Sequence, residues 1–426
     1  MRVLTVYHAG RDASHRSRFR ALVERGIELH LVVPATWPEE GSELALTAEP
    51  YPVHQLPVVR PGDVNRHRYV NDSDVRQLIK SVRPDIIDLQ EEPVSTATAQ
   101  WLRHAEAIPV AMYTAQNVDK RFPPPFSYRE TAALKRADGV YACTRQAAAV
   151  VRGKGFQGVL DVLPLGIGDA FRTGEQSIKS PPLRLLMTGR LVPEKGLLDA
   201  MKVLEALNRS IPATLTIVGA GPDHAPAEAL AVALGVSGSV DFQGWTDEKT
   251  LAETYRNHHF LLIPSRATNT WAEQFGRVIV EAQASGCVVA GYASGAIPEV
   301  AGQAGLLVDE GDWPGLAKIV YEVALAETRF QDLRRIGLAQ AEGARWSVVA
   351  GRQQELYRAI THRPSAGLSA YLDASKRDAA AEDYGHPARL ANGIPRPLAV
   401  PLLRNNKLLS LAIGRMADIA TSGRKR

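Results

Sequence analysis

Cysteine is scarce in this sequence of 426 residues, and the two cysteines present, Cys143 and Cys287, lie 144 positions apart. Cysteines at this distance make no ligand cluster, which argues against a structural zinc site and favours a reducing compartment. The sequence also lacks an apolar run of the roughly 18 residues that a membrane-spanning helix needs. Its opening, MRVLTVYHAG, is typical of a buried strand and a glycine turn and not of a signal segment. We therefore expect a cytoplasmic location, either free or peripheral to the inner face of a membrane.

A net positive charge is missing from most of the chain. Residues 389–426 hold eight Lys or Arg and one Asp, a net charge of +7, so the other 388 residues carry −3 of the overall +4. The basic balance therefore belongs to a tail, and no zinc-finger, RNA-recognition or basic-zipper pattern is present. We expect no nucleic-acid partner. With 45% apolar and 23% charged residues, the chain has enough apolar side chains for folded cores.

The patterning predicts two successive α/β domains. Short β-branched runs alternate with helical stretches of about 10–15 residues, which is the pattern of βαβ units and parallel sheets. The first half has predicted strands at 3–8, 28–34, 85–90, 109–114, 139–144 and 160–166, with helices near 14–25 and 73–82. The pattern restarts with predicted strands at 183–190, 214–221, 240–245, 259–265, 288–293 and 305–310. We predict doubly wound, Rossmann-like domains over 1–174 and 175–345 and a C-terminal helix at 346–363.

A basic extension is predicted over 364–426. Within it, 402–420 has the pattern of a basic amphipathic helix, with Leu402, Leu409 and Ile413 on one side. Two interpretations stay open. The segment either makes peripheral membrane contact, or it is a terminal helix or tail without that role.

The sharpest chemical signal is EQFGRVIVEAQASG, at 273–286. Glu273 and Glu281 are eight residues apart, so on a helix they would differ by about 12 Å in height and about 80° in bearing. This separation does not suit an acid and a base that act on one bond, but it suits two carboxylates at opposite ends of an extended ligand. Between them, Phe275 and Gly276 would bring backbone N–H groups to a helix N-terminus, which favours a phosphate. Two solvated glutamates are the alternative.

A second signal is LLMTGRLVPEKGLLDAM, at 185–201. A strand, a tight turn, the cations Arg190 and Lys195 and a helix start together make an anion site, although no P-loop pattern is present. The alternative is an ordinary loop with exposed basic residues. The nearby IVGAGP, at 217–222, lacks the third glycine of a dinucleotide-binding turn. We interpret it as a turn that lets the backbone approach a ligand.

These segments follow one another as GRLVPEKG, IVGAGP, VDFQGW, EQFGRVIVE and GAIPEV. In this order and spacing they resemble glycosyltransferase family 4, specifically over 183–310 and in architecture over about 1–360. The resemblance implies the type B glycosyltransferase fold (GT-B), in which two Rossmann-like domains face each other across an interdomain cleft. It also implies a retaining transfer of a sugar from a nucleoside-diphosphate sugar (NDP-sugar) to an acceptor.

The resemblance assigns roles to four charged residues. Arg190 and Lys195 match the pair that holds the diphosphate and neutralises the leaving group. Glu281 matches the carboxylate that accepts the ribose hydroxyls, and Glu273 matches the one near the donor sugar. Because cations and a helix dipole meet the charge that grows on the phosphate, the resemblance implies no obligatory metal and no cofactor. No carboxylate is placed as a nucleophile.

Four further positions are carried over as substrate contacts. Phe275 and Gly276 match backbone contacts to the donor. Phe242 lies where the family seats the nucleobase. Gly10, after the first strand, matches the glycine turn that faces the diphosphate from the other domain.

The chain departs from the family pattern at 110–122, where many members have a histidine and this sequence has Gln116 and Asn117. An amide can hydrogen-bond a donor-sugar hydroxyl, but it takes no proton at neutral pH. We expect these two residues to contact the donor sugar, with catalysis led by the leaving phosphate.

The loop HAGRDASHRSRFR, at 8–20, is the predicted acceptor side. At helical spacing Arg11 and Arg18 share one face, and Arg16 and Arg20 share another. Such faces suit an anionic or lipid-linked acceptor, whose identity stays open. A solvated basic helix is the alternative.

Two other functions stay open. An NDP-sugar epimerase on the same fold needs an acid–base pair, which the sequence does not identify. A catalytically degenerate glycosyltransferase-like partner protein should have lost Arg190, Lys195 or the two glutamates, and all four are present.

Overall fold

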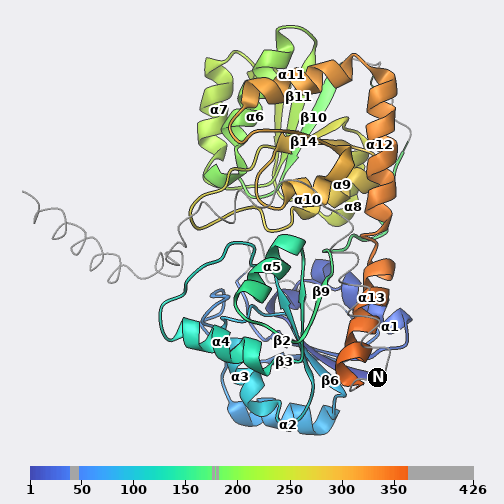
Figure 1. The fold of residues 1–426 in the computed structure, drawn as a ribbon. Coiled ribbons are helices and arrows are strands. Elements are labelled where there is room, and N and C mark those ends of the chain that lie inside the picture. The colour runs from blue at the N-terminus through green and yellow to red at the C-terminus, as the bar shows by residue number, and fades with distance from the viewer. Residues whose placement is uncertain (39–47, 175–177, 179–181, 363–426) are drawn as a thin grey trace, which may run out of the picture.

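A computed structural model describes residues 1–38, 48–174, 178 and 182–362 of the chain. These residues form two α/β units, one above the other in the view of Figure 1. The predicted basic extension and its segment 402–420 lie outside the described residues. None of the described helices combines the length and the apolar character needed to cross a membrane.

The N-terminal unit is built on a seven-stranded parallel sheet in the order β3-β2-β1-β6-β7-β8-β9. The strands are β1 (Arg2–Val6), β2 (Glu28–Pro34), β3 (Val53–Leu56), β6 (Ile86–Leu89), β7 (Val110–Thr114), β8 (Gly139–Ala142) and β9 (Val159–Val162). Its helices are α1 (Ser17–Glu24), α2 (Asp72–Val82), α3 (Thr96–His104), α4 (Phe126–Arg136) and α5 (Arg145–Gly153). The strands β6 and β8 are buried along their whole length because helices cover both faces of a parallel sheet.

Sequence patterning missed three strands of this unit. β3 lies at the sheet edge and is only half-buried, so it carries a weak apolar signal. An antiparallel pair of two-residue strands, β4 (Val58–Val59) and β5 (Arg68–Tyr69), is too short to show a period. The predicted helix near 14–25 begins later, at Ser17, and two 3₁₀ turns, η1 (His8–Arg11) and η2 (Ala13–His15), precede it.

The C-terminal unit repeats the plan with a six-stranded parallel sheet in the order β12-β11-β10-β13-β14-β15. The strands are β10 (Leu183–Thr188), β11 (Ala213–Val218), β12 (Val240–Gln243), β13 (Phe260–Ile263), β14 (Val288–Tyr292) and β15 (Gly305–Val308). Its helices are α6 (Leu197–Asn208), α7 (His224–Ala233), α8 (Glu248–Arg256), α9 (Arg277–Ala284), α10 (Ile297–Ala301), α11 (Trp313–Ala324) and α12 (Glu327–Glu342), with short 3₁₀ turns η3 (Pro193–Lys195), η4 (Ser237–Ser239) and η5 (Gly302–Ala304). The two parallel sheets confirm the predicted α/β class.

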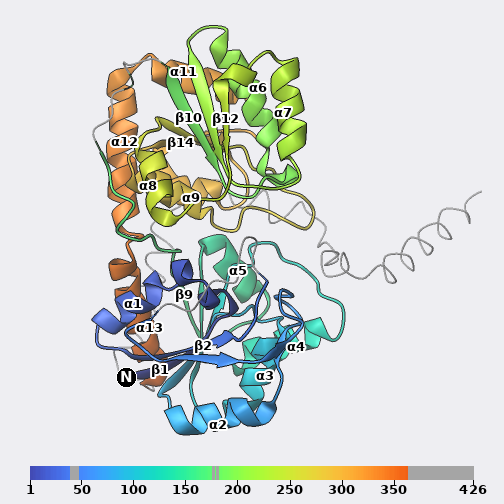
Figure 2. The ribbon, with the colours of Figure 1, turned by 180° about the vertical axis from the view of Figure 1, so that it is seen from behind.

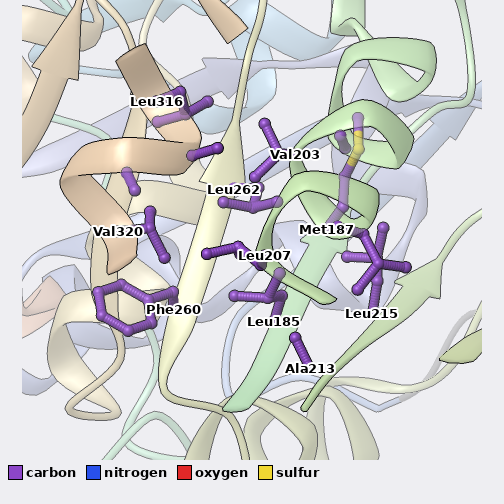
Figure 3. Packing of buried hydrophobic residues seen from close by; sticks show 14 of the residues in the cluster. Leu185, Met187, Val203, Leu207, Ala213, Leu215, Phe260, Leu262, Leu316 and Val320 are labelled. Carbon is purple, nitrogen blue, oxygen red and sulfur yellow. The ribbon is translucent and has the colours of Figure 1, made fainter. Parts of the chain in front are cut away.

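Each sheet carries apolar clusters on its faces. In the C-terminal unit, Leu185, Leu215 and Leu262 project from strands toward side chains of α6 and α11, such as Leu207 and Val320 (Figure 3). Each of these side chains is almost completely buried. At about 1.5–3 kcal/mol for each buried large aliphatic side chain, such clusters dominate the stability of a unit.

The chain returns to the N-terminal unit at its end. Helix α13 (Trp346–Thr361) follows α12 and packs along α1, as Figure 2 shows from behind. The units also touch where their strands end: Asn117 Nδ2 donates to Glu273 O at 2.7 Å, and Arg145 N donates to Glu299 Oε1 at 2.7 Å. The carboxyl ends of the two sheets therefore meet. The domain boundaries of the sequence analysis stay predictions.

Candidate functional site

The strand order of the C-terminal sheet marks one place for a ligand. β10 lies between β11 and β13, so the chain leaves β10 and β13 toward opposite sides of the sheet. Loops that diverge in this way open a crevice at the carboxyl end of a parallel sheet, where open α/β sheets bind their ligands. The loop after β10 carries Arg190 and Lys195, and the loop after β13 carries Glu273. Sequence motifs about 80 residues apart are thus brought to one edge.

Lys195 and Glu273 form an ion pair across this edge. Lys195 Nζ lies 2.6 Å from Glu273 Oε2, and Ser265 Oγ donates to the same oxygen at 3.3 Å. The ammonium also lies 5.3 Å from the centre of the Trp271 ring. Glu273 is buried, whereas the Lys195 side chain retains 18% exposure. The sequence predicted both residues at the donor, but it gave no sign that they pair, nor that Ser265 and Trp271 join them.

Backbone geometry fixes the position of Lys195. Gly196 follows it with φ of 72° and precedes the first residue of α6. A Cβ at Gly196 would lie 2.1 Å from Pro264 O, so only glycine allows the two loops to approach this closely. Arg190 lies on the same loop and is exposed, and its side chain makes no hydrogen bond with the residues that the structure describes. Its guanidinium is therefore available to a ligand.

The predicted turn at 217–222 has another role in the structure. A Cβ at Gly219 would lie 1.9 Å from Gly189 O, and one at Gly221 would lie 2.3 Å from Leu191 O. These glycines let the turn pack against the chain's own 189–191 loop. The sequence predicted that this turn approaches a ligand closely. Where a Cβ would lie at Gly219 and Gly221, the turn instead approaches the backbone of the chain itself.

The helical placement predicted for Glu273 is wrong. α9 begins at Arg277, and Gly276 before it has φ of 77°, so Glu273 lies in a loop. The buried Phe275 side chain packs in the core with Ile279, which leaves only its backbone for a ligand. The separation of about 12 Å and about 80° expected for Glu273 and Glu281 on one continuous helix therefore does not apply. The left-handed conformation of Gly276 reverses the chain direction just before the helix.

Of the two glutamates predicted at the donor, Glu281 is the one that lies on α9. It is buried, its Oε1 accepts from Arg277 Nε at 2.8 Å, and its Oε2 accepts from the Tyr255 hydroxyl at 3.1 Å. Burial raises the pKa of Tyr255 well above its ordinary value, so this phenol stays protonated and donates. The sequence analysis missed Tyr255, because nothing in α8 marks it except its apolar spacing.

Other predicted residues surround this edge. Phe242 is half-buried at the end of β12, with its ring centre 4.5 Å from that of His224. Asn117 follows β7 and is buried, with its amide bonded to the Glu273 carbonyl, and Gln116 Nε2 donates to Val118 O. Asn117 therefore connects the N-terminal unit directly to the loop of Glu273.

The basic faces predicted for 8–20 are absent. Arg16 is completely buried, with its Nε donating to Gly10 O at 2.6 Å, and both Arg16 and Arg20 pair with Glu49. Arg18 is buried as well and donates to Gln90 and Gln353. These arginines hold the Gly10 turn, α1 and α13 together. They are engaged internally because the segment folds as two 3₁₀ turns and a short helix.

The N-terminal sheet has its own point of divergence, between β1 and β6. His8 follows β1 and Glu91 follows β6; His8 N and Nδ1 each lie 2.7 Å from an oxygen of Glu91. Burial alone would lower the pKa of His8, but the charge and hydrogen bond of Glu91 outweigh burial and raise it. His67 is completely buried beside them. The sequence gives no ligand spacing for these residues, since they come from three distant segments.

An arginine-lined pocket lies next to this cluster. Arg60, Arg66, Arg68 and Arg129 line it together with Val59, Thr96, Pro125 and Phe126, and none of these eight described residues is acidic. Arg129 Nη1 donates to Thr96 Oγ1 at 2.8 Å, and its guanidinium lies 5.3 Å from the centre of the Phe126 ring. A pocket of this composition favours an anion. Arg60, Arg66 and Arg68 lie close together in the sequence. Arg129 joins them only because α4, which carries it, packs beside them in the fold.

Two protein families match the chain. Residues 172–337 match "Glycosyl transferases group 1", and residues 19–170 match "Glycosyltransferase Family 4". D-inositol 3-phosphate glycosyltransferase 1 of Catenulispora acidiphila is 28% identical over 262 residues, which cover 56% of this chain and 62% of that protein. The corresponding Corynebacterium efficiens protein is 32% identical over 207 residues, 45% of this chain and 46% of that protein. The matches thus span less than two thirds of these relatives.

Solved structures show the same fold. Sucrose-phosphate synthase of Thermosynechococcus elongatus superposes with a TM-score of 0.64 at 18% identity, over 84% of this chain and 98% of that chain. Anabaena HepE in complex with UDP and glucose superposes with a TM-score of 0.63 at 16% identity, over 84% and 100%. Both confirm the predicted arrangement of two Rossmann-like domains.

Proposed function

This chain belongs to glycosyltransferase family 4, and on that premise we propose that it transfers a sugar from an NDP-sugar to an anionic acceptor with retention of anomeric configuration. The observation that carries the proposal is the Lys195–Glu273 pair, which lies at the divergence of β10 and β13 on the same loops as the exposed Arg190. This arrangement places two cations and a carboxylate where an open α/β sheet receives a ligand.

Arg190 and Lys195 are the proposed diphosphate ligands. An ammonium has three N–H donors, so Lys195 can keep its bond to Glu273 and still donate to a phosphate oxygen. Glu281, held by Tyr255 and Arg277, retains lone pairs for the ribose hydroxyls.

Backbone around Phe275 and Gly276, the turn at Gly10 and the end of β12 at Phe242 are the proposed remaining donor contacts. Gln116 is a proposed contact of the donor sugar. Asn117 is proposed to act there both by contact and by positioning the loop of Glu273.

In the proposed reaction the bond between the anomeric carbon and the phosphate oxygen breaks, and its electron pair goes to the phosphate. The acceptor oxygen bonds to the anomeric carbon on the same face, and its proton passes to the departing phosphate. Negative charge grows on that phosphate and is stabilised by Arg190 and Lys195. Glu273 contacts the donor sugar. Because these two cations supply the positive charge, the donor step is proposed to need neither a metal nor a cofactor.

The acceptor is proposed to be a phosphate-bearing molecule in the arginine-lined pocket. A cluster of four guanidiniums favours phosphate, and the pocket belongs to the N-terminal unit, whereas Arg190 and Lys195 belong to the C-terminal unit. The relatives from Catenulispora acidiphila and Corynebacterium efficiens are D-inositol 3-phosphate glycosyltransferases, and this name gives those proteins an acceptor with a phosphate.

Calorimetric titration of the purified protein with UDP, GDP, ADP and dTDP tests the donor half. UDP is the first probe because Anabaena HepE was solved with it. We expect micromolar binding of one nucleotide, lost in Arg190→Ala and kept in Arg335→Ala, an exposed arginine of α12 that pairs with Asp332. If none of the four nucleotides binds, the donor proposal fails. That result would favour the alternative of a catalytically degenerate glycosyltransferase-like partner protein. Conversion of the NDP-sugar without an acceptor would instead indicate the epimerase.

Transfer to inositol 3-phosphate, compared with transfer to uncharged inositol, tests the acceptor half. Within the described residues, the Arg68 side chain makes only long hydrogen bonds, to the Tyr69 and Val70 carbonyls at 3.4 and 3.3 Å, so its removal should leave the fold intact. We expect Arg68→Ala to raise the KM of the phosphorylated acceptor about tenfold, the loss of roughly one charge-assisted contact, with donor KM unchanged. Equal use of both acceptors, or an unchanged KM in Arg68→Ala, would contradict the assignment.

A further inference from the structure

Three ligand-type side chains converge at the divergence of β1 and β6. His8 follows β1, Glu91 follows β6, and His67 precedes β5. One ligand atom from each lies within 4.8 Å of the others. They come from three segments that are distant in sequence, and all three belong to the N-terminal unit, whereas Arg190 and Lys195 belong to the C-terminal unit.

The contacts between His8 and Glu91 leave one nitrogen of the third residue, His67, without a hydrogen-bond partner among the described residues. It is completely buried, and its Nδ1 lies 3.2 Å from the Asp63 carbonyl oxygen. A carbonyl oxygen only accepts, so Nδ1 carries the proton of that bond, and in the neutral ring Nε2 presents a lone pair. Nε2 makes no hydrogen bond within the described part of the chain. Its nearest charged neighbour is Glu91 Oε1, at 3.9 Å.

A lone pair that faces a carboxylate oxygen is an unfavourable contact. The His8–Glu91 pair satisfies those two residues, but it gives Nε2 of His67 no donor, and an unsatisfied buried nitrogen costs roughly 1–3 kcal/mol. A cation bound by both atoms removes this conflict. Bonds of about 2.0–2.2 Å place two ligands of one metal roughly 3–4 Å apart, which is close to the observed separation.

We propose that His8, His67 and Glu91 bind a divalent first-row transition metal, for which Zn²⁺ is the probe. Two imidazoles and one carboxylate are donors that Zn²⁺ accepts, and three protein ligands leave a fourth position open. The Asp63 carbonyl orients His67 as an outer-shell partner. Trp37 encloses the cluster, with ring centres 4.8 Å from His8 and 4.9 Å from His67.

The site shares no residue with the proposed donor contacts, although His8 and Gly10 lie on the same turn η1, and it goes beyond the proposed function. Neither the diphosphate ligands nor the sugar-transfer step involves it. Its test therefore measures metal binding and not activity, and it succeeds or fails independently of the nucleotide titrations.

The experiment uses untagged full-length protein stripped with a chelator and titrated with Zn²⁺ against a chromophoric competitor. We expect one equivalent bound with a micromolar or lower Kd, and at least tenfold weaker binding in His67→Gln. The matched control is His54→Gln, because His54 contacts His30 at 3.0 Å in another histidine pair of the same unit, and the carboxylate that lies 3.8 Å from His30, Glu28, is exposed.

A second readout guards against a folding defect. Co²⁺ should give visible d–d bands in the wild type that disappear in both His67→Gln and Glu91→Gln, each checked for wild-type circular dichroism. The proposal is overturned if the wild type binds no Zn²⁺ saturably, if His67→Gln binds it with unchanged Kd, or if His54→Gln abolishes the binding.

Discussion

Lys195→Ala separates the catalytic contribution of the lysine from its structural one. In the proposed function, Lys195 stabilises charge on the leaving diphosphate. A charge-assisted hydrogen bond of this kind contributes about 1.5–3 kcal/mol. Its loss should lower kcat/KM for the NDP-sugar by about 10- to 150-fold, since about 1.4 kcal/mol corresponds to a factor of ten.

The same substitution leaves Glu273 buried with only Ser265 at 3.3 Å, which we expect to cost roughly 1–3 kcal/mol of unfolding free energy. Glu273→Gln in the Lys195→Ala background removes that buried charge. The double variant should therefore regain stability in urea denaturation. Because Glu273 is itself a proposed contact of the donor sugar, the discriminating readout is calorimetric binding of UDP, which has no donor sugar. UDP binding should stay weakened in the double variant if Lys195 is a diphosphate ligand, and it should return if Lys195 serves only to neutralise Glu273.

Lys202→Ala is a matched control. Lys202 also pairs with a buried carboxylate, Asp199 at 3.2 Å, and lies 6.0 Å from the centre of the Trp313 ring. It lies on α6, outside the loops after β10 and β13, so we expect wild-type kcat/KM. An unchanged kcat/KM in folded Lys195→Ala, or an equal loss in Lys202→Ala, would refute the reasoning.

Three further predictions concern the donor site and the fold. Glu281→Gln should weaken nucleotide binding by roughly 1–3 kcal/mol in calorimetry, because a carboxylate ligand of the ribose is replaced by a neutral amide; unchanged binding would remove Glu281 from the site. Gly196→Ala should lower Tm more than Gly235→Ala does, since both glycines have φ near 70° (72° and 70°) but a Cβ meets a backbone carbonyl only at Gly196; equal shifts would show that the loop moves freely. Burial alone would raise the pKa of Glu49, but its ion pairs with Arg16 and Arg20 hold this pKa below the ordinary value for a glutamate. Its stabilisation is therefore present above about pH 4.5 and is lost as the pH falls through the lowered pKa. Glu49→Gln should abolish this part of the acid dependence in urea titrations and cost roughly 1–3 kcal/mol at pH 7, whereas a wild-type profile would show that the pair contributes nothing.

The cationic loop of the proposed donor site could be located from the sequence because it depends on local patterns. A strand that ends in GRLVPEKG already fixes two cations and a glycine at a helix start, and the structure places Arg190, Lys195 and Glu273 on adjacent loops of one sheet edge. The loop placement of Glu273 was missed because the apolar pattern of 273–286 continues past Gly276. Only the backbone shows that this glycine has φ of 77° and that the helix starts after it.

The arginines of 8–20 show the opposite failure. Helical spacing predicted exposed basic faces, but Glu49, Gln90 and Gln353 engage Arg16, Arg18 and Arg20 in the folded chain. A sequence pattern shows which residues are charged, and it does not show whether a distant carboxylate or amide packs beside them.

The sequence by itself determined the two α/β units, the order of the motifs of the proposed donor site and the family, because each depends on short local patterns and on their order along the chain. The tertiary structure alone decided which charges pair, as in Lys195 with Glu273, and which distant side chains converge, as in His8, His67 and Glu91. The physical reason is that strand order, and not sequence separation, sets which loops are neighbours. In each sheet the crevice lies between strands that are adjacent in space and far apart along the chain.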